Sequence, residues 1–498
     1  MPEIVLTADR NLMSDYGGSI FTGFAACAPR LLPDPLFHLF LCPPLPHRKG
    51  VALFAPAGTR KIEAVLLEEG FDVVVGHPDH LEEVVDEKTR AVGITTNDPL
   101  GLGPASSTFS SLVGRETYSA IHFRELITHR VLRRANLRVI VGGPGAWQLA
   151  ESRLMAKYGI DCVVLGEGEV VAPELFRRAV RGESLPPLVE GGPTPLEKIP
   201  SIRNPTVSGI VEVARGCGRG CRFCVPTQRY LRSLPLEKIK EEMRVNAAAG
   251  HLVIHAEDVL RYGASGILPD EQKVVALFQE VARTGMDASA SHAAFASVAS
   301  SPSLVQRITE LLNIGSKQKP FFGVQMGIET GSPSLIERHM KGKALPFRPE
   351  EWPEVVVRAH GILADQHWVP CSTLVMGLPG ETQEDVERTR ELVERLAEFR
   401  SLIIPLFFVP LSSLSGEKFF TVKDMRGEHW RLYAACLRHD FKWVGSLARD
   451  HFKDSRLRRV MMKVLTGVMR RKLEPYLKLM EEGENPLRGG SSASPPRL

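Results

Sequence analysis

Two long stretches of the chain alternate short β-branched runs with amphipathic helical segments. In the first stretch the expected strands are residues 72–76, 91–96, 138–142 and 161–166. Such alternation builds a parallel sheet, because each helix carries the chain back to the start of the next strand. We therefore expect an open, doubly wound, Rossmann-like domain over residues 1–185, with a ligand site at the carboxyl ends of its strands.

The second stretch repeats the pattern, with about six strands expected at residues 210–214, 252–255, 288–291, 322–327, 373–376 and 402–408. Unbroken strand–helix units predict a partial (β/α)6 barrel over residues 208–411, with its chemistry at the carboxyl ends of the strands. Residues 186–207 are rich in proline and glycine and predict a linker. The fold class is therefore α/β, followed by a helical region over 412–482 and a disordered tail over 483–498.

Composition excludes several classes of protein. A net charge of +4 over 498 residues is too small to favour a nucleic-acid partner. The first ten residues lack the basic and apolar regions of a signal peptide, and the apolar residues 402–411 are too short for a membrane span. Five dispersed cysteines and one tight cluster indicate a reducing, cytoplasmic location and a metal site.

The cluster is Cys217, Cys221 and Cys224, directly after the first expected barrel strand. Thiolates at this spacing suit an iron–sulfur cubane, and three of them leave one iron open to another ligand. Glycine at positions 216, 218 and 220 permits close backbone approach and positive φ. The alternative, zinc, normally takes four ligands, and no fourth Cys or His lies nearby.

This spacing, with aromatic Phe223 before the third cysteine, resembles the signature of the radical S-adenosylmethionine (SAM) superfamily. The resemblance implies a 4Fe-4S cluster whose open iron binds the amino and carboxylate groups of SAM. It also implies that reduction by a donor such as ferredoxin or flavodoxin cleaves SAM to methionine and a 5′-deoxyadenosyl radical.

Polar residues at strand ends are the candidate SAM contacts beside Phe223: Glu257, Ser289, Gln325 and Glu329. Glu257 stands where these enzymes often carry Gly-Gly-Glu, and Asp258 replaces it if the register shifts by one. Inward-facing polar side chains also form structural networks inside barrels, so that alternative stays open for Gln325 and Glu329.

Three loops at strand ends of the first domain outline one cleft, and those at residues 141–145 and 165–169 resemble loops of cobalamin-binding domains joined to radical SAM barrels. The candidate cobalamin contacts are Thr95, Thr96, Asn97, Asp98, Leu100, Gly142, Gly143, Pro144, Gly145, Gly166, Glu167 and Gly168. The Asp-x-His-x-x-Gly motif that supplies a cobalt ligand is absent, and we expect His77 and His80 to be surface residues. The lower face of cobalt then meets water or a non-coordinating side chain.

The pairing of a radical initiator with a methyl carrier implies an anaerobic C-methyltransferase acting on an unactivated sp3 carbon. Unusual words, among them TNDPLGLGP and ERHMKGKALPF, resemble a methanogen-type branch that modifies a glutamine of the methyl-coenzyme M reductase alpha subunit, a post-translational modification. Asp9, Asp15 and Tyr16 are then candidates for cofactor or peptide contact. The rivals are ring formation or C–C coupling on archaeal lipids and a non-catalytic cobalamin or redox sensor. Methylthiotransfer is disfavoured because it needs further cluster cysteines.

Overall fold

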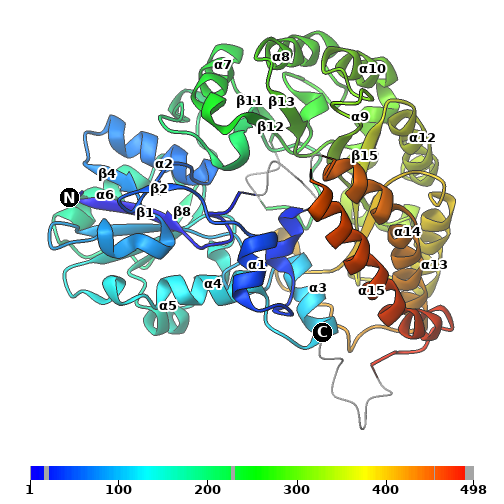
Figure 1. Cartoon of the computed structure of the whole chain (residues 1–498), viewed down its shortest axis with the longest axis horizontal. Coiled ribbons are helices and arrows are strands. Elements are labelled where there is room, and N and C mark those ends of the chain that lie inside the picture. The colour runs from blue at the N-terminus through cyan, green and yellow to red at the C-terminus, as the bar shows by residue number, and fades with distance from the viewer. Residues whose placement is uncertain (1, 16–21, 226–229, 454, 488–498) are drawn as a thin grey trace.

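The computed structural model describes residues 2–15, 22–225, 230–453 and 455–487. Figure 1 shows two α/β lobes side by side, an N-terminal lobe in blue and cyan and a barrel lobe in green and yellow. The predicted role of Tyr16 and most of the predicted tail, residues 488–498, fall outside the described residues.

The N-terminal lobe is built on one parallel sheet of six strands in the order β4-β1-β5-β6-β7-β8. Its strands are β1 (Ile4–Ala8), β4 (Val73–Val75), β5 (Ala91–Thr95), β6 (Arg138–Gly142), β7 (Cys162–Gly166) and β8 (Leu188–Gly191). The chain winds to one side of β1 and then to the other, so the switch point lies between β1 and β5. This is the predicted doubly wound sheet.

Two of these strands were not predicted. β1 is a short apolar run buried on both faces, with Val5 in one core and Ile4 and Leu6 in the other. β8 lies inside the predicted linker, where Leu188–Gly191 pairs in parallel with β7. The connection between the lobes therefore begins after Gly191.

Helices cover both faces of this sheet. α2 (Ala57–Glu68) and α6 (Ala172–Val180) supply one core, and α4 (Tyr118–Ile127) and α5 (Ser152–Tyr158) supply the other. An antiparallel pair, β2 (His47–Arg48) and β3 (Val51–Ala52), lies beside the end of β4, where Val51 bridges Gly76.

The barrel lobe contains the six predicted strands, all parallel: β9 (Ile210–Glu212), β12 (His251–His255), β13 (Asp287–Ala290), β14 (Phe322–Glu329), β15 (Trp368–Met376) and β16 (Leu402–Phe407). β9, β12 and β13 form one ladder and β14, β15 and β16 another. The two meet where Gln325 N donates to Ser291 O at 2.9 Å and Gln325 O accepts from Ala293 N at 3.1 Å. The predicted partial barrel is thus present.

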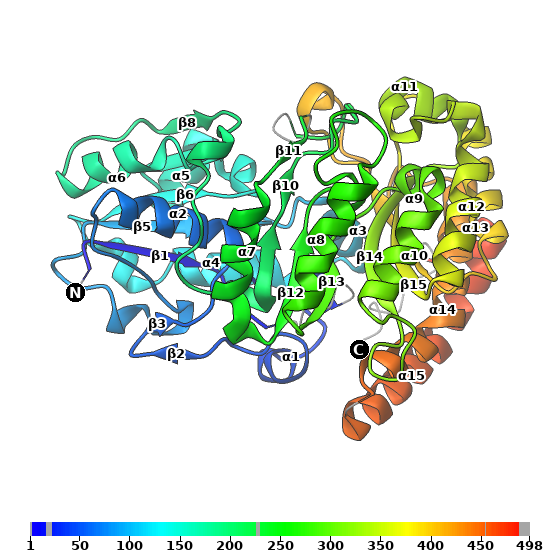
Figure 2. The ribbon, with the colours of Figure 1, turned by 90° about the horizontal axis from the view of Figure 1, so that it is seen from above.

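Figure 2 shows the helices of this lobe outside the strands. They are α7 (Leu236–Val245), α8 (Glu271–Arg283), α9 (Phe295–Ser300), α10 (Pro302–Leu311), α11 (Pro333–Ala344), α12 (Trp352–Asp365) and α13 (Gln383–Arg395). Along β14 the buried residues Phe322, Val324 and Met326 alternate with partly exposed Gly323 and Gln325. Since side chains alternate across a strand, apolar residues pack under the helices and polar ones face the barrel interior.

β16 is the last strand of the barrel, and two other parts of the chain cover its edge. The first is α3 (Pro104–Val113) of the N-terminal lobe, where Thr108 Oγ1 accepts a hydrogen bond from Phe407 N at 2.7 Å. The second is α14 (Gly427–His451), where Asp440 Oδ1 accepts a hydrogen bond from Ile403 N at 2.8 Å. Side-chain oxygens thus bind backbone groups that an edge strand leaves unpaired.

Helices α14 and α15 (Arg456–Glu481) lie in the helical region predicted over residues 412–482. Among the described residues, no helix combines the length and apolar character that crossing a bilayer requires.

Candidate functional site

A cavity of about 1130 Å³ lies between the lobes, where the carboxyl ends of both sets of strands meet. This volume exceeds the range typical of pockets for drug-sized ligands. The N-terminal lobe contributes the loops after β5, β6, β7 and β8 and the start of α2. The barrel contributes residues beside the cysteine loop, Gly216 and Val225, and Glu257 after β12.

Nine of the twelve residues predicted to bind cobalamin line this cavity: Thr95, Thr96, Asn97, Gly142, Gly143, Pro144, Gly166, Glu167 and Gly168. Gly143 has φ +97°, and a Cβ there would lie 2.5 Å from Thr96 O. Only glycine therefore lets the loops after β5 and β6 pack together. The cavity wall here is largely backbone, which suits a broad ligand surface.

The other three, Asp98, Leu100 and Gly145, are not among the lining residues. Asp98 Oδ1 accepts from Gly103 N at 2.9 Å and from Gln148 Nε2 at 2.7 Å, and Gln148 Oε1 accepts from Leu100 N at 2.8 Å. A Cβ on Gly145 would lie 2.3 Å from Asn97 O. These three residues therefore support the conformation of the loop and do not line the cavity.

The histidines after β4 differ from the prediction that both are surface residues. His77 is only 2% exposed, and neither His77 nor His80 lines the cavity. Among the described lining residues the only histidine is His255, which belongs to the barrel. The described part of the N-terminal lobe thus presents no imidazole to the cavity.

The three clustered cysteines occupy the loop between β10 (Ala214–Arg215) and β11 (Arg232–Ser233), and none of the three forms a disulfide. Gly216, Gly218 and Gly220 have φ of 73°, 66° and 67°, as the sequence predicted. Two buried arginines hold the loop. Arg261 Nη1 donates to Cys217 O, and Arg219 Nη1 donates to Leu345 O at 2.9 Å after α11.

The chemistry of these thiols fits a metal cluster. Burial first, and then the nearby Cys217 and Cys221, raise the pKa of Cys224 to about 12. Burial also raises the pKa of Cys221. Three thiolates so close together need a compensating cation, which an iron–sulfur cluster provides. Lys343, which lies near Cys221 and Cys224, is the nearby positive side chain.

The structure distinguishes Glu257 from Asp258. Glu257 lines the cavity, and its charge acts on Cys224. Asp258 is 1% exposed, and its carboxylate accepts from Ser297 Oγ at 2.7 Å, Ala294 N at 3.2 Å and Arg219 Nη2 at 3.3 Å. Asp258 is therefore used in holding Arg219 and the loop, and Glu257 remains the candidate SAM contact.

The other predicted SAM contacts fall into three surroundings. Phe223, between the cysteines, packs on the barrel core, and Gln325 contacts His292 inside the barrel. Ser289 Oγ lies 3.2 Å from His251 Nε2, at the first residue of β12 and away from the carboxyl ends. Ser289 is thus not brought to the site.

Glu329 ends β14 in the left-handed region, with φ 63°. Its Oε1 lies 2.9 Å from Lys343 Nζ, and its Oε2 accepts from Thr373 Oγ1 at 3.3 Å. Burial lowers the pKa of Lys343, but Glu329 and Cys221 together raise it above the usual value, so the ammonium stays charged. The sequence pattern named Glu329 but not Lys343.

A network of charges joins the lobes beside the cavity. Arg215 Nη1 lies 2.7 Å from Glu167 Oε2, and Arg215 Nη2 lies 2.6 Å from Glu169 Oε1. Arg215 Nε lies 2.7 Å from Glu212 Oε1, and Arg232 also pairs with Glu167. Burial favours a raised pKa for Glu167, but Arg232, Thr194 N and Arg215 outweigh it and hold the pKa at about 2. Sequence analysis missed Arg215, although it ends a strand just before the cysteine loop.

Comparison with known proteins agrees with this geometry. Residues 211–393 match the family model described as the Radical SAM superfamily. A protein of Methanopyrus kandleri described as uncharacterized is 26% identical over 407 residues, which cover 69% of this chain and 70% of that protein. The tRNA-2-methylthio-N(6)-dimethylallyladenosine synthase of Syntrophomonas wolfei is 28% identical over 278 residues, 53% of this chain and 57% of the synthase. The chain thus spans just over half the length of that synthase.

Two solved structures of TsrM, a radical SAM methyltransferase from Kitasatospora setae, share the fold. The structure with cobalamin and a 4Fe-4S cluster has a TM-score of 0.54 at 17% identity, over 83% of this chain and 77% of that one. The structure with tryptophan and a SAM analogue has a TM-score of 0.53 over 80% and 72%. Residues 211–393 of this chain are a radical SAM domain, set in an overall fold that the chain shares with TsrM.

Proposed function

We propose that this protein is a cobalamin-dependent radical SAM methyltransferase that methylates an unactivated sp3 carbon. The observation that carries the proposal is the single cavity that joins glycine-rich loops of the N-terminal sheet to the surroundings of the three-cysteine loop and Glu257. TsrM, with the same fold, binds cobalamin and a 4Fe-4S cluster.

When bound, the reduced cluster, SAM and cobalamin supply the radical that removes a hydrogen atom and the methyl group that replaces it. The chain's own residues position these groups. Cys217, Cys221 and Cys224 would hold the cluster, and Glu257 would accept a hydrogen bond from the SAM ammonium. Residues 142–144 and 166–168 would face cobalamin, because all six line the cavity.

For the substrate we propose a peptide, in the narrowest form a glutamine of the methyl-coenzyme M reductase alpha subunit. The support for this narrower proposal is the set of unusual sequence words, including Glu337–Phe347 around Lys343. Ring formation or C–C coupling on a lipid is the rival, since it would use the same cluster and cavity without moving a methyl group.

The test is anaerobic reconstitution with iron, sulfide and cobalamin, followed by reaction with methyl-labelled SAM and a strong reductant. Mass spectrometry of candidate reductase peptides and archaeal lipids then locates the label. Label on a peptide carbon supports the proposal, and a lipid product without label reverses it. The Cys224→Ala protein is the matched control, which must give neither product nor cleaved SAM.

Methylthiotransfer has a separate outcome in the same experiment, because its product gains sulfur as well as carbon. The relative from Syntrophomonas wolfei is named for that reaction on tRNA. In the described chain the five remaining cysteines lie in separate places along the fold, and four of them are buried. A labelled tRNA carrying added sulfur would replace our proposal with that activity.

A further inference from the structure

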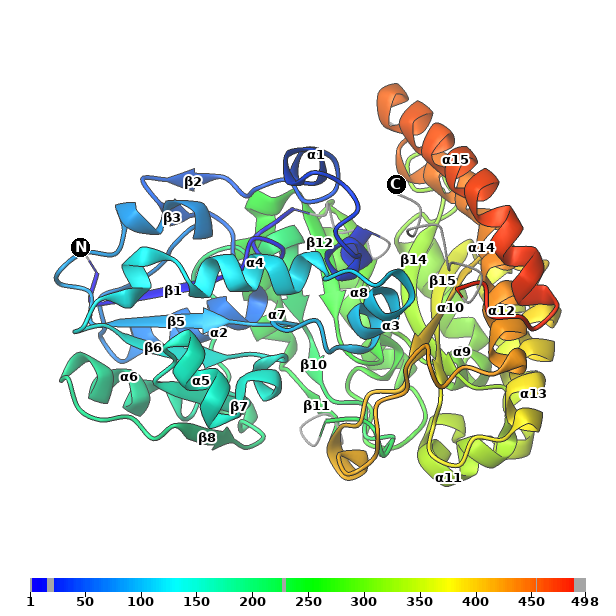
Figure 3. The same ribbon diagram turned by 90° about the horizontal axis from the view of Figure 1, so that it is seen from below.

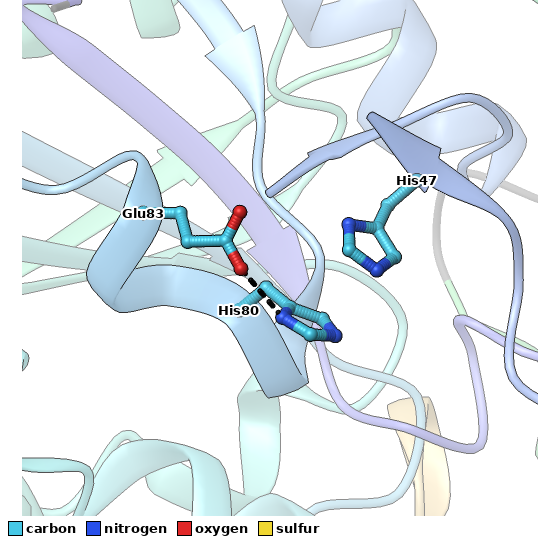
Figure 4. A group of neighbouring side chains, drawn as sticks. All are labelled: His47, His80 and Glu83. Carbon is cyan, nitrogen blue, oxygen red and sulfur yellow. Dashed lines mark hydrogen bonds and ion pairs between the residues drawn. The ribbon is translucent and has the colours of Figure 1, made fainter. Parts of the chain in front are cut away.

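Outside the cavity, three side chains that favour metal ions come together on the N-terminal lobe. His47 lies on β2, and His80 and Glu83 lie on the 3-10 helix Pro78–Glu83 that follows β4. One ligand atom from each lies within 4.8 Å of the other two, as Figure 4 shows for the three side chains. None of them lines the cavity.

The two segments that carry this trio are locked together. Gly50, between β2 and β3, has φ +75°, and a Cβ there would lie 2.8 Å from both Glu83 Cβ and His80 O. Gly50 O also accepts from His77 N at 2.8 Å. The backbone positions of the trio are therefore set before any ligand arrives, which lowers the cost of binding.

A third histidine lies beside the trio, and its ring has an unsatisfied hydrogen-bond donor. His77 is 2% exposed, and its ring centroid lies 5.2 Å from that of His47 and 5.3 Å from that of His80. Its Nδ1 accepts from Asp79 N at 3.2 Å, which leaves the proton of the neutral ring on Nε2. That Nε2 is buried and has no hydrogen-bond partner among the residues that the structure describes. A buried donor without an acceptor costs about 1–3 kcal/mol.

We propose that His47, His80 and Glu83 bind a zinc ion, with water in the remaining position. Two histidines and one glutamate are a known zinc donor set with an open position, and water there gives the Nε2–H of His77 an acceptor. The ion takes the place of the 2.8 Å hydrogen bond between His80 Nδ1 and Glu83 Oε1, and the proton of the neutral His80 ring moves to Nε2. His80 and Glu83 are 38% and 44% exposed, so an ion from solvent reaches them. Bound there, zinc joins the β2–β3 pair to the edge of the sheet.

The test uses the full-length protein with its iron–sulfur cluster reconstituted, so that the clustered thiols are occupied. After dialysis against zinc, elemental analysis should find one zinc per chain, lost in His80→Ala and in the shape-preserving Glu83→Gln. His129→Ala, in the same lobe, should keep it. Zinc should raise the melting temperature of the wild type and of His129→Ala, but not that of the two site variants. Zinc retained by both variants, or absent from the wild type, overturns the site.

A second feature, independent of the histidine site, is an apolar surface on α15 that no described part of the chain covers. The first half of α15 leaves six large apolar side chains exposed, at helical spacing: Leu457, Val460, Val464, Leu465, Val468 and Met469. Leu457 is 75% exposed. In a globular protein such a stripe normally faces a core.

The same helical segment is strongly basic. From Arg456 to Lys472 the sequence holds seven lysines and arginines and no aspartate or glutamate. Two copies of such a segment repel one another, whereas an anionic surface attracts it. A helix with one apolar face and a basic remainder is the form that lies in a lipid interface.

A second exposed apolar group lies on the same side of the molecule. Leu36 and Leu39 of α1 (Asp34–Phe40), with Leu32 just before it, are exposed. Figures 2 and 3 show that α1 and the first half of α15 both project from one side of the body. Apolar groups from two ends of the chain can thus meet one flat partner together.

We infer that this face docks on an anionic lipid bilayer, with its apolar side chains at the acyl boundary and its arginines and lysines on lipid phosphates. The full-length protein should sediment with vesicles containing phosphatidylglycerol and not with phosphatidylcholine alone, and salt should release it. Val464→Asp should abolish binding. Replacing Arg470, Arg471 and Lys472 by Gln should weaken it about a hundredfold.

Lys442→Gln, on α14, is the control and should bind normally. SAM cleavage by every variant shows that the fold is intact. Equal binding to neutral vesicles, or none to anionic ones, overturns the inference. A wild-type dimer that Val464→Asp converts to a monomer would assign the face to a second copy of the chain.

Discussion

The two lobes use the same architecture to present opposite chemistries. Both are parallel sheets whose carboxyl ends open on one cavity. The N-terminal lobe offers glycine-rich loops there, at Gly142, Gly143, Gly166 and Gly168, together with apolar side chains such as that of Trp147. The barrel offers charged groups and, beside the cavity, three thiols.

This difference shows how one type of sheet serves two kinds of ligand. A surface of backbone accepts a broad molecule by shape, and any added side chain obstructs it. Thiols and carboxylates instead bind particular atoms, so that one deletion removes a bond. We therefore expect substitutions that add atoms to impair ligand binding by the N-terminal lobe. In the barrel we expect substitutions that remove a ligand atom to impair it.

The largest expected effect is in the barrel. Cys224→Ala removes one of three cluster ligands and should abolish reductive SAM cleavage, because the remaining two thiolates do not hold the cubane. Iron and sulfide content and the visible absorption of the reconstituted protein measure the loss.

Cys436→Ala is the matched control, since Cys436 is fully buried on α14 and away from the loop. It should keep the cluster while losing some stability. A Cys224→Ala protein that still cleaves SAM would break the assignment of the loop.

The next effect is in the N-terminal lobe and should come from an added methyl group. Gly143→Ala places Cβ 2.5 Å from Thr96 O at φ +97°, which should cost about 1–3 kcal/mol and displace the loop. Cobalamin retained after gel filtration should fall with it. Gly142→Ala should be tolerated, because its nearest neighbour to Cβ lies at 3.8 Å.

Gly142→Leu then separates folding from ligand binding. Gly142 lines the cavity, and a Cβ there would meet the nearest backbone atom, Val164 O, only at 3.9 Å. Cobalamin should therefore be lost while the melting temperature stays near that of Gly142→Ala. Cobalamin retained by Gly142→Leu would contradict the backbone surface proposed here.

The strands of the barrel could be predicted from the sequence more completely than those of the N-terminal lobe, and the reason is physical. All six barrel strands were predicted, because each lies between clear helical patterns in a regular strand–helix alternation. β1 and β8 were missed, since a five-residue run at the start of the chain and a strand beside Pro186 and Pro187 have no such context. The cysteine loop could be predicted from the sequence alone, because its three cysteines lie close together along the chain.

Side-chain partners were harder to predict than motifs. The ion pairs of Lys343 with Glu329 and of Arg215 with Glu167 join residues that no local spacing connects. Asp98 was predicted as a contact but supports its loop, because a polar residue at a strand end serves either role.

A smaller effect should separate two adjacent carboxylates of the barrel. Glu257→Gln should raise the KM for SAM by about 10–100-fold with little change in melting temperature, because Glu257 lines the cavity. Asp258→Asn should lower the melting temperature and cluster content, since it weakens the hold on Arg219. The reverse result would return the SAM contact to Asp258.

The smallest effect concerns the charges between the lobes. Folding lowers the pKa of Glu167 from its usual 4.5 to about 2, so its contribution to stability is full above about pH 4.5 and disappears as the pH falls toward 2. Glu167→Gln should melt about 2–4 °C below wild type at pH 7. This difference in melting temperature should shrink on acidification, because Glu167 of the wild type becomes protonated whereas glutamine does not titrate. Thermal unfolding of both proteins without metal, from pH 7 to 3, measures it, with exposed Glu174→Gln as control. A gap that stays constant with pH would mean that the Arg215 and Arg232 pairs do not stabilise the contact between the lobes.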